Sequence, residues 1–189
     1  MTIPSQTDLN KREQKLKGFL KNLDKDGKTK EVRAIGAVRS AIRQAWMKSD
    51  TKLAYLYMNT IPDMDDSTRS KWLFKCEICG DLFKLADIEV DHKSGNHPFT
   101  KVEEFENYFE NILMVGFDGL QILCKDDHDT KTLMESIGCT WGEALAHKQA
   151  IEIIKSKKDK EWLEERNIKP ASNQKARRAQ ILEVLKNER

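Results

Sequence analysis

Several common features are absent from this chain of 189 residues, and each absence excludes a class of protein. No apolar run approaches the roughly 20 residues that a membrane helix requires, so we expect no membrane-spanning segment and no membrane partner. The N-terminus lacks the basic start and apolar stretch of a signal peptide, which favours a cytoplasmic protein. The sequence also shows no internal repeat and no low-complexity segment, which excludes a repeat architecture.

A strong net charge is absent as well. The 33 basic and 31 acidic residues leave a formal net charge of only +2, so bulk charge alone predicts no binding to nucleic acid. The charges are nevertheless segregated, because acidic residues gather in 63–66 and 103–110 and basic ones in 11–21 and 175–178. Segregation of this kind suits a polyanionic partner, although solvated helix faces produce the same pattern.

Cysteine is scarce, and the chain has only Cys76, Cys79, Cys124 and Cys139. Disulfides are rare in the cytoplasm, where thiols stay reduced. We therefore expect the C-x-x-C pair at 76–79 to be a metal site or a redox pair and not a disulfide staple.

The spacing of apolar residues predicts a mostly helical α+β fold. Hydrophobic residues make up 39% of the chain and charged residues 34%, so the core is modest and the surface highly charged. We expect helices over 10–22, 30–47, 51–58, 102–114, 125–137 and 141–156 and after a cap at Ser172, with short strands over 72–75, 82–90 and 120–123. These elements predict a helical N-terminal extension (1–60), a central core (61–138) and a helical C-terminal extension (139–189).

Three short motifs lie within one small-domain length of the central segment. They are C-E-I-C at 76–79, V-D-H at 90–92 and L-Q-I-L-C-K-D-D-H-D-T-K at 120–131. Cysteines with this spacing build structural zinc sites. A histidine beside an acidic residue, with a second histidine downstream, is what metal-assisted phosphodiester cleavage needs. The segment therefore predicts a fold and a reaction together.

These motifs resemble those of the HNH endonucleases, the ββα-metal nucleases, and most of all the variety found in tailed phages. The resemblance covers roughly residues 30–185 and is strongest in 74–132. It extends to the helix with arginine and tryptophan at 39–50 and to the tail at 167–178. It implies a ββα-metal nuclease core in the central segment. It also implies a phage-encoded DNA endonuclease in the host cytoplasm, with a role in homing or in genome packaging beside a terminase.

The same resemblance implies roles for individual residues. His92 would be the general base that takes a proton from the attacking water, since an imidazole titrates near neutrality. Asp91 and His128 would bind the catalytic divalent metal, which would be Mg or Mn given carboxylate, imidazole and phosphate ligands. Lys131, one helical turn beyond His128, would contact a phosphate. The expected products are a 5′ phosphate and a 3′ hydroxyl.

The zinc motif departs from the pattern of the family at one position. The family commonly has two C-x-x-C pairs, but here the second pair reads Cys124-Lys-Asp-Asp127. Three interpretations stay open. Asp127 supplies an oxygen ligand and completes a structural zinc site with Cys76, Cys79 and Cys124, or Cys139 reaches the site in its place. Otherwise zinc is weakly bound or missing, and packing holds the knuckle together.

The middle residue of the H-N-H pattern departs as well. Gly119 stands where the family often has an asparagine that braces the loop carrying the catalytic histidine. Asn96, Asn107 or Asn111 would have to take over that role. Of these, Asn111 is the best placed as a loop brace, because it lies just before the break in the helix.

Two other functions fit parts of the same sequence. A C-x-x-C pair is often only a zinc knuckle that folds a small domain, so a non-catalytic DNA-binding or scaffold module is one alternative. The same chemistry directed at RNA is the other. Four arginines are candidates for contacts with the DNA backbone, although solvated helix faces would explain them equally well. They are Arg39, Arg43, Arg177 and Arg178.

Overall fold

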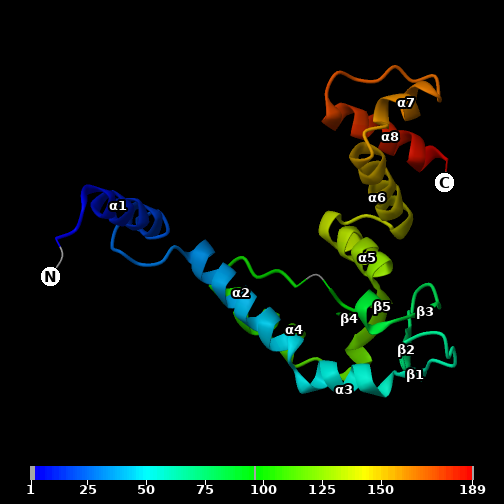
Figure 1. Cartoon of the computed structure of the whole chain (residues 1–189), viewed down its shortest axis with the longest axis horizontal. Helices are drawn as coiled ribbons and strands as arrows, with labels where there is room; N and C mark the ends of the chain where they lie inside the picture. Colours follow the sequence, from blue (N-terminus) through cyan, green and yellow to red (C-terminus); the bar gives the residue numbers. More distant parts are fainter. Residues whose placement is uncertain (1–2, 96, 189) are drawn as a thin grey trace. The chain divides into compact units, whose positions relative to one another are not determined.

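The chain has a mostly helical α+β fold with two small antiparallel sheets, as the sequence predicts (Figure 1). The structure is a computed structural model, and it describes residues 3–95 and 97–188. These residues form two compact units. We call residues 56–95 and 120–188 the site unit, and residues 3–55 and 97–119 the helical unit. The helix expected over 102–114 thus belongs to the same unit as the N-terminal helices.

The site unit begins with a three-stranded sheet. Strand β2 (Trp72–Lys75) pairs on one side with β1 (Ile61–Pro62) and on the other with β3 (Leu82–Phe83), both antiparallel. The return strand expected over 82–90 is interrupted by a 3₁₀ turn, η1 (Leu85–Asp87). The interruption has a physical reason, because the residues before the turn pair with β2 whereas those after it pair with a different strand.

That second sheet consists of β4 (Ile88–His92) and β5 (Leu120–Cys124), which run antiparallel with Asp91 opposite Gln121 and His92 opposite Leu120. Alternate residues of β4 are buried, as expected of a strand with one face on the core. Helix α5 (Lys125–Ile137) follows β5 without a loop and ends at Gly138. The backbone φ of Gly138 is 64°, a left-handed conformation that glycine adopts without strain.

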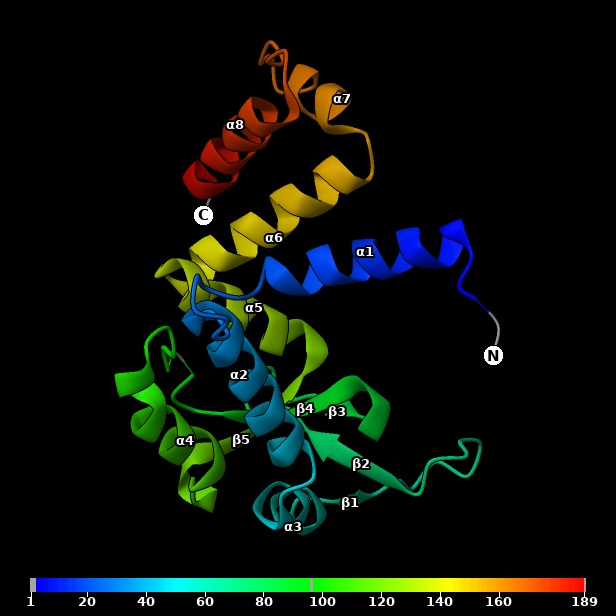
Figure 2. The same ribbon diagram turned by 90° about the vertical axis from the view of Figure 1, so that its left-hand side faces the viewer.

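The C-terminal helices of the site unit are α6 (Trp141–Lys155), α7 (Asp159–Glu164) and α8 (Gln174–Asn187) (Figure 2). Thr140 and Glu143 form a capping box at the start of α6. The predicted cap of the last helix is wrong by one position, since the side chain that caps α8 is Asn173 and not Ser172. The core of these helices is formed by Ala146, Ala150, Leu163, Ile181 and Leu185.

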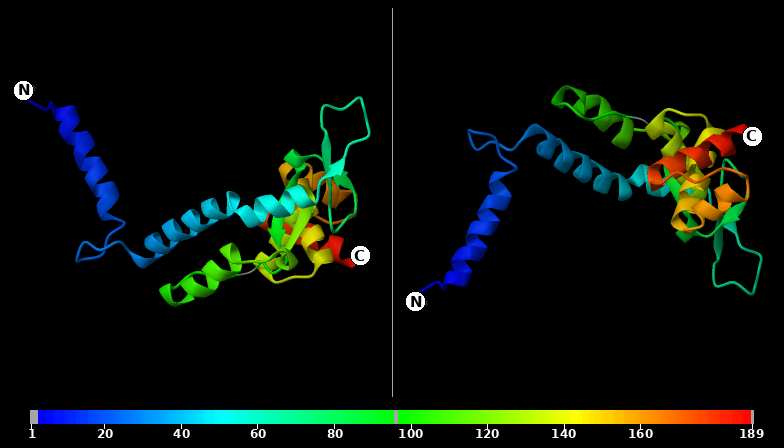
Figure 3. Two further views of the ribbon diagram at one scale, coloured as in Figure 1. Left: turned by 90° about the horizontal axis from the view of Figure 1, so that it is seen from below. Right: turned by 90° about the horizontal axis from the view of Figure 1, so that it is seen from above.

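The helical unit contains α1 (Gln6–Leu20), α2 (Glu31–Met47), the start of α3 (Asp50–Met58), α4 (Phe105–Leu113) and the 3₁₀ turns η2 (Val102–Glu104) and η3 (Phe117–Gly119). Helices α2 and α4 lie side by side (Figure 3). Ile35 and Ile42 of α2 pack against Phe99 and Tyr108, whose rings stack with centroids 5.2 Å apart. In the part of the chain that the structure describes, no helix is both long and apolar enough to cross a bilayer.

Candidate functional site

A cluster of three cysteines and one aspartate lies where β2, β5 and α5 meet. The potential ligand atoms of Cys76, Cys79, Cys124 and Asp127 all lie within 4.8 Å of one another. The first two residues flank a tight turn after β2, closed by a hydrogen bond from the Gly80 amide to the Cys76 carbonyl at 3.0 Å. Cys124 ends β5 and caps α5, whose first turn carries Asp127. Residues from two distant segments thus converge on one point.

The turn between the first two cysteines is fixed to β5 through Glu77. The Glu77 amide donates to the Ile122 carbonyl at 2.9 Å, and the Ile122 amide donates to Glu77 Oε1 at 2.9 Å. Cys76 is fully buried and packs with Leu123 and Cys124. The thiolate positions are therefore held by backbone hydrogen bonds and packing, which limits the rearrangement that metal binding would require.

The chemistry of this cluster fits a metal such as zinc. Burial raises the pKa of the Cys124 thiol to about 12. Burial alone would raise the pKa of the Asp127 carboxyl, but hydrogen bonds from Cys76, Cys124 and Cys79 outweigh it and lower that pKa. The Cys76 thiol donates to Asp127 Oδ2 at 3.1 Å. Thiol protons thus point at an ionised carboxylate. Binding of a metal would release those protons, and the thiolates and the carboxylate would then share the positive charge of the ion.

Of the three interpretations of the zinc motif, the arrangement favours the one in which Asp127 is the fourth ligand. Its carboxylate lies among the three sulfur atoms. Cys139 lies beyond the end of α5, and its thiol donates to the Thr140 carbonyl at 3.4 Å. Among the described residues, the fourth potential ligand atom of the cluster is therefore a carboxylate oxygen and not a thiol sulfur.

The acidic and imidazole residues of the predicted catalytic site also meet in the site unit. Asp91 is the fourth residue of β4, and His128 lies in the first turn of α5. Asp91 Oδ1 and His128 Nε2 are 3.7 Å apart. The separation is too long for a strong hydrogen bond. One ion could contact both atoms, because metal–ligand distances of about 2.1 Å span up to about 4.2 Å.

The other carboxylate oxygen of Asp91 is held by two donors. Gln121 Nε2 donates to Asp91 Oδ2 at 2.9 Å from the opposite position on β5. Lys131 Nζ lies 2.9 Å from the same oxygen. Because Oδ2 is occupied in this way, the Oδ1 atom is the one that faces His128. Hydrogen bonds of this kind orient metal-binding carboxylates in proteins.

Lys131 has a different environment from the one that its predicted role requires. Its side chain is buried, 2.7 Å from Glu135 Oε1 and 2.9 Å from Asp91 Oδ2, and it donates to the His92 carbonyl at 2.7 Å. Burial opposes its charge, but hydrogen bonds to Glu135 and Asp91 outweigh burial and raise the pKa of Lys131. All three ammonium donors have protein acceptors. A contact with a phosphate would have to break one of these bonds.

Sequence reasoning missed two residues of this network, Gln121 and Glu135. Each had a detectable signal. Gln121 lies opposite Asp91 as soon as the two strands are paired in register, and Glu135 stands four residues after Lys131, where helical side chains meet. His92 lies beside Asp91 at the end of β4 with 9% of its surface exposed, and its carbonyl accepts from Lys131.

Comparisons with known protein families, curated proteins and solved structures give no match for this chain. The resemblance to HNH nucleases therefore depends on the motif residues alone.

The predicted loop brace is not located by the structure. Asn111 lies in the helical unit. Its side-chain Nδ2 donates to the backbone carbonyl of Asn107 at 2.7 Å within α4. Asn96 lies outside the described residues. At Gly119, an added Cβ would lie 2.5 Å from Val115 Cγ2, so a larger residue would have to displace that side chain. The brace by Asn111 stays a prediction.

The four candidate arginines have unlike surroundings. Arg39 and Arg43 line a surface hollow of about 440 Å³ on α2, together with Gly36 and Ser40. Arg178 is exposed on α8. Arg43 and Arg178 have the access to solvent that a DNA contact needs, whereas Arg39 is half-buried, with its guanidinium 6.0 Å from the centre of the Tyr108 ring.

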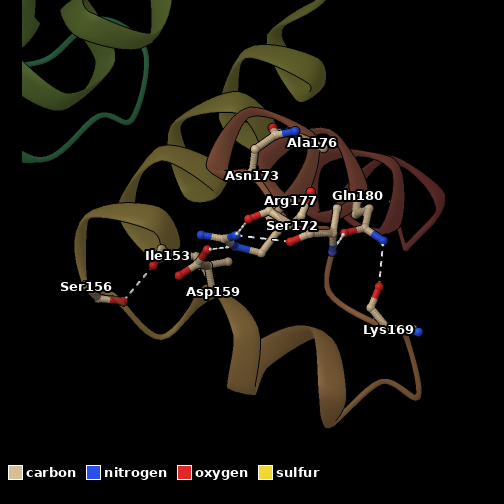
Figure 4. A network of polar contacts seen from close by, with 10 residues as sticks. Ile153, Ser156, Asp159, Lys169, Ser172, Asn173, Ala176, Arg177 and Gln180 are labelled. Atoms are coloured by element: carbon tan, nitrogen blue, oxygen red, sulfur yellow. Dashed lines mark hydrogen bonds and ion pairs between the residues drawn. The ribbon is translucent and has the colours of Figure 1, made fainter.

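Arg177 is instead part of the fold (Figure 4). Its side chain is 12% exposed, forms an ion pair with Asp159, and donates to the carbonyls of Ala171 and Ser172 at 3.1 Å each. These bonds hold the start of α7 against the turn that leads into α8. We therefore assign Arg177 a part in the packing of the C-terminal helices, and its contact with DNA stays a prediction.

Proposed function

We propose that this chain is a metal-dependent HNH DNA endonuclease, with β4, β5 and α5 as its ββα-metal core. The observation that carries the proposal is the 3.7 Å separation of Asp91 Oδ1 and His128 Nε2, with His92 as the next residue of β4. Two protein ligands, with the rest left to water and phosphate, is how Mg is commonly bound. The residues present thus fit a Mg or Mn ion at Asp91 and His128.

The proposed mechanism divides the work among three residues. When bound, the metal supplies positive charge for the phosphate and for the leaving 3′ oxygen. His92 takes a proton from the attacking water on an imidazole nitrogen. Asp91 and His128 hold their ligand atoms on facing elements, and Gln121 fixes the rotamer of Asp91. Asp127, the fourth residue of the thiol cluster, directly precedes His128, so zinc bound by the cluster would fix the first turn of α5.

The resemblance also supplies the setting that we propose. The substrate is DNA, and the protein acts in the cytoplasm of a phage-infected host, in homing or in genome packaging beside a terminase. The competing function is a non-catalytic zinc-knuckle module for DNA binding or scaffolding. The thiol cluster by itself fits both functions, so His92 is the residue that distinguishes them.

Nicking of supercoiled plasmid tests the proposal. We expect conversion to open-circle or linear DNA with Mg or Mn, and none when no divalent metal is added. His92→Ala should lower the rate by at least about a hundredfold. His92 is buried, so the melting temperature of the variant is measured as well, and the two rates are compared at a temperature at which both proteins are folded.

The matched control is His147→Ala. His147 is a partly buried histidine on α6 of the same unit, outside the proposed site. This variant should cleave like the unmodified protein. Bound but uncleaved DNA under every metal condition would reject the nuclease and favour the non-catalytic module. A parallel assay with RNA distinguishes the second enzyme function.

A further inference from the structure

The ammonium group of Lys131 lies within a cage of three oxygen atoms. Lys131 Nζ is 2.7 Å from Glu135 Oε1, 2.9 Å from Asp91 Oδ2 and 2.7 Å from the carbonyl oxygen of His92. Only 7% of Lys131 is exposed. The buried charge of Lys131 lies next to the proposed metal site. Neither contact with a phosphate nor packing alone explains why a positive charge is placed there.

This set of oxygens is one that hard divalent cations prefer. Two carboxylates and a backbone carbonyl are typical donors for Mg, Mn and Ca. Without Lys131, the two carboxylates would leave two negative charges in a mostly buried place. With it, the three side chains sum to a single negative charge, as −1 for Asp91, +1 for Lys131 and −1 for Glu135. The lysine thus supplies the charge that a second metal ion would otherwise supply.

Asp91 is shared between the two places. Its Oδ2 atom belongs to the cage, whereas Oδ1 faces His128 Nε2 at 3.7 Å. A cation already fixed on one oxygen of a carboxylate limits an incoming ion to the other oxygen. The position of Lys131 therefore determines which side of Asp91 is open to a metal.

Glu135, which supplies one oxygen atom of the cage, is held in place by the loop after β4. An added Cβ at Gly95 would lie 2.0 Å from Glu135 Oε2, so the carboxylate packs directly over this glycine. Glu135 is thus confined between the loop and the ammonium group, with a side-chain exposure of 22%. The cage is built from β4, the loop after it and α5, all within the site unit.

We propose that Lys131 is a positioning residue that fills a latent cation site formed by Asp91, Glu135 and the His92 carbonyl, and so confines the divalent ion to Asp91 and His128. The part that concerns the catalytic ion rests on the proposed function. The latent site does not, because it depends only on the oxygen atoms around Lys131.

Counting bound Mn²⁺ in Lys131→Met tests the proposal. Methionine keeps the length and apolar stem of the side chain and removes the charge. Free Mn²⁺ is measured by its electron paramagnetic resonance signal in titrations of zinc-saturated protein. We expect Lys131→Met to bind one more Mn²⁺ per chain than the unmodified protein. The double variant Lys131→Met, Glu135→Gln should lose that additional ion. An equal count in the unmodified protein and Lys131→Met would overturn the proposal.

A second variant keeps the test decisive if Lys131→Met does not fold. Glu135→Gln retains an oxygen acceptor for Lys131 but removes one negative charge, so the full lysine charge falls on Asp91. The affinity for Mn²⁺ should then fall on the order of tenfold, although Glu135 is not a ligand. An unchanged affinity would also overturn the proposal. Plasmid nicking by the unmodified protein is scored separately, so failure of the nuclease and failure of the latent site give different results.

Discussion

Asp127 is the residue at which the thiol cluster differs most from an ordinary structural zinc site. Its carboxylate accepts a hydrogen bond from the Cys76 thiol at 3.1 Å, and its backbone amide donates to Cys124 Sγ at 3.4 Å. An oxygen ligand in place of a thiolate makes the site harder and less selective for soft metals. The cluster should therefore hold zinc less tightly than a site with four thiolates would.

Substitution at Asp127 tests that expectation in both directions. Asp127→Cys should raise the affinity for zinc, and Asp127→Asn should lower it, each on the order of tenfold, because one adds a thiolate and the other removes a charged ligand. Competition with a chromophoric chelator measures both. If Asp127→Asn and the unmodified protein compete equally, Asp127 is not a ligand, and the cysteines hold zinc without it.

Arg177 and Arg178 are neighbours of equal charge, but the side chain of Arg177 is largely buried and that of Arg178 is exposed. Arg177→Ala would leave Asp159 buried without its partner, which costs about 3 kcal/mol or more of unfolding free energy. Arg178→Ala should stay within about 0.5 kcal/mol, because that side chain is exposed. Urea denaturation measures both variants. Equal stabilities would mean that the ion pair of Arg177 and Asp159 contributes little to the fold.

At the scale of elements, the start of α6 is joined to α8 by one ion pair. Lys186 Nζ lies 2.7 Å from Glu143 Oε1, and Glu143 also completes the capping box with Thr140. The hydrogen bond from Lys186, followed by that from the Thr140 amide, lowers the pKa of Glu143 to about 2, from an ordinary value of 4.5. Glu143 therefore stabilises the fold while it is ionised.

The pH dependence of stability follows from the sign of that shift. A carboxyl with a lowered pKa contributes stability above its ordinary pKa and loses the contribution as the pH falls from about 4.5 towards 2. Glu143→Gln retains the capping box but not the charge. It should be less stable than the unmodified protein at pH 7, with the difference shrinking below pH 4.5. Denaturation curves at pH 7 and pH 3 measure this, and a constant difference would contradict it.

The sequence predicted those elements whose signals are local. Strand 72–75 and helix 125–137 have the expected bounds, because alternation, cysteine placement and the terminal Gly138 all lie within a few residues. The segment 82–90 was predicted as one strand because its partner is set by long-range pairing, which one sequence does not reveal. Sequence spacing likewise suggested Asp91 and His128 but not the oxygen cage, since burial of Lys131 depends on packing between β4 and α5.

At the scale of the whole molecule, charge balance limits how the chain can bind DNA. A formal net charge of +2 gives little long-range attraction, so the proposed affinity for DNA would have to come from local groups of arginine and lysine. Arg39 and Arg43 form one such group around the hollow on α2. Phosphate contacts release counterions, and each contact contributes about 0.9 to the slope of log affinity against log salt.

The salt dependence of DNA binding therefore reports on these two arginines. The double variant Arg39→Ala, Arg43→Ala should reduce the magnitude of that slope by about 2, with the same effect for any DNA sequence. Fluorescence anisotropy at several salt concentrations measures the slope. An unchanged slope would show that α2 is a solvated helix face and that the DNA contacts lie elsewhere.

The order in which the two units are completed follows from their interleaved sequence. The core of α2 lacks Phe99 and Tyr108 until the second segment of the helical unit has been synthesised, and β4 lacks its partner strand until residue 124 has been. Cys76 and Cys79 are synthesised before Cys124 and Asp127, the other two residues of the cluster. Until then the first C-x-x-C pair supplies only two of the four potential ligand atoms, so a metal site of all four residues can form only after the start of α5 has been synthesised.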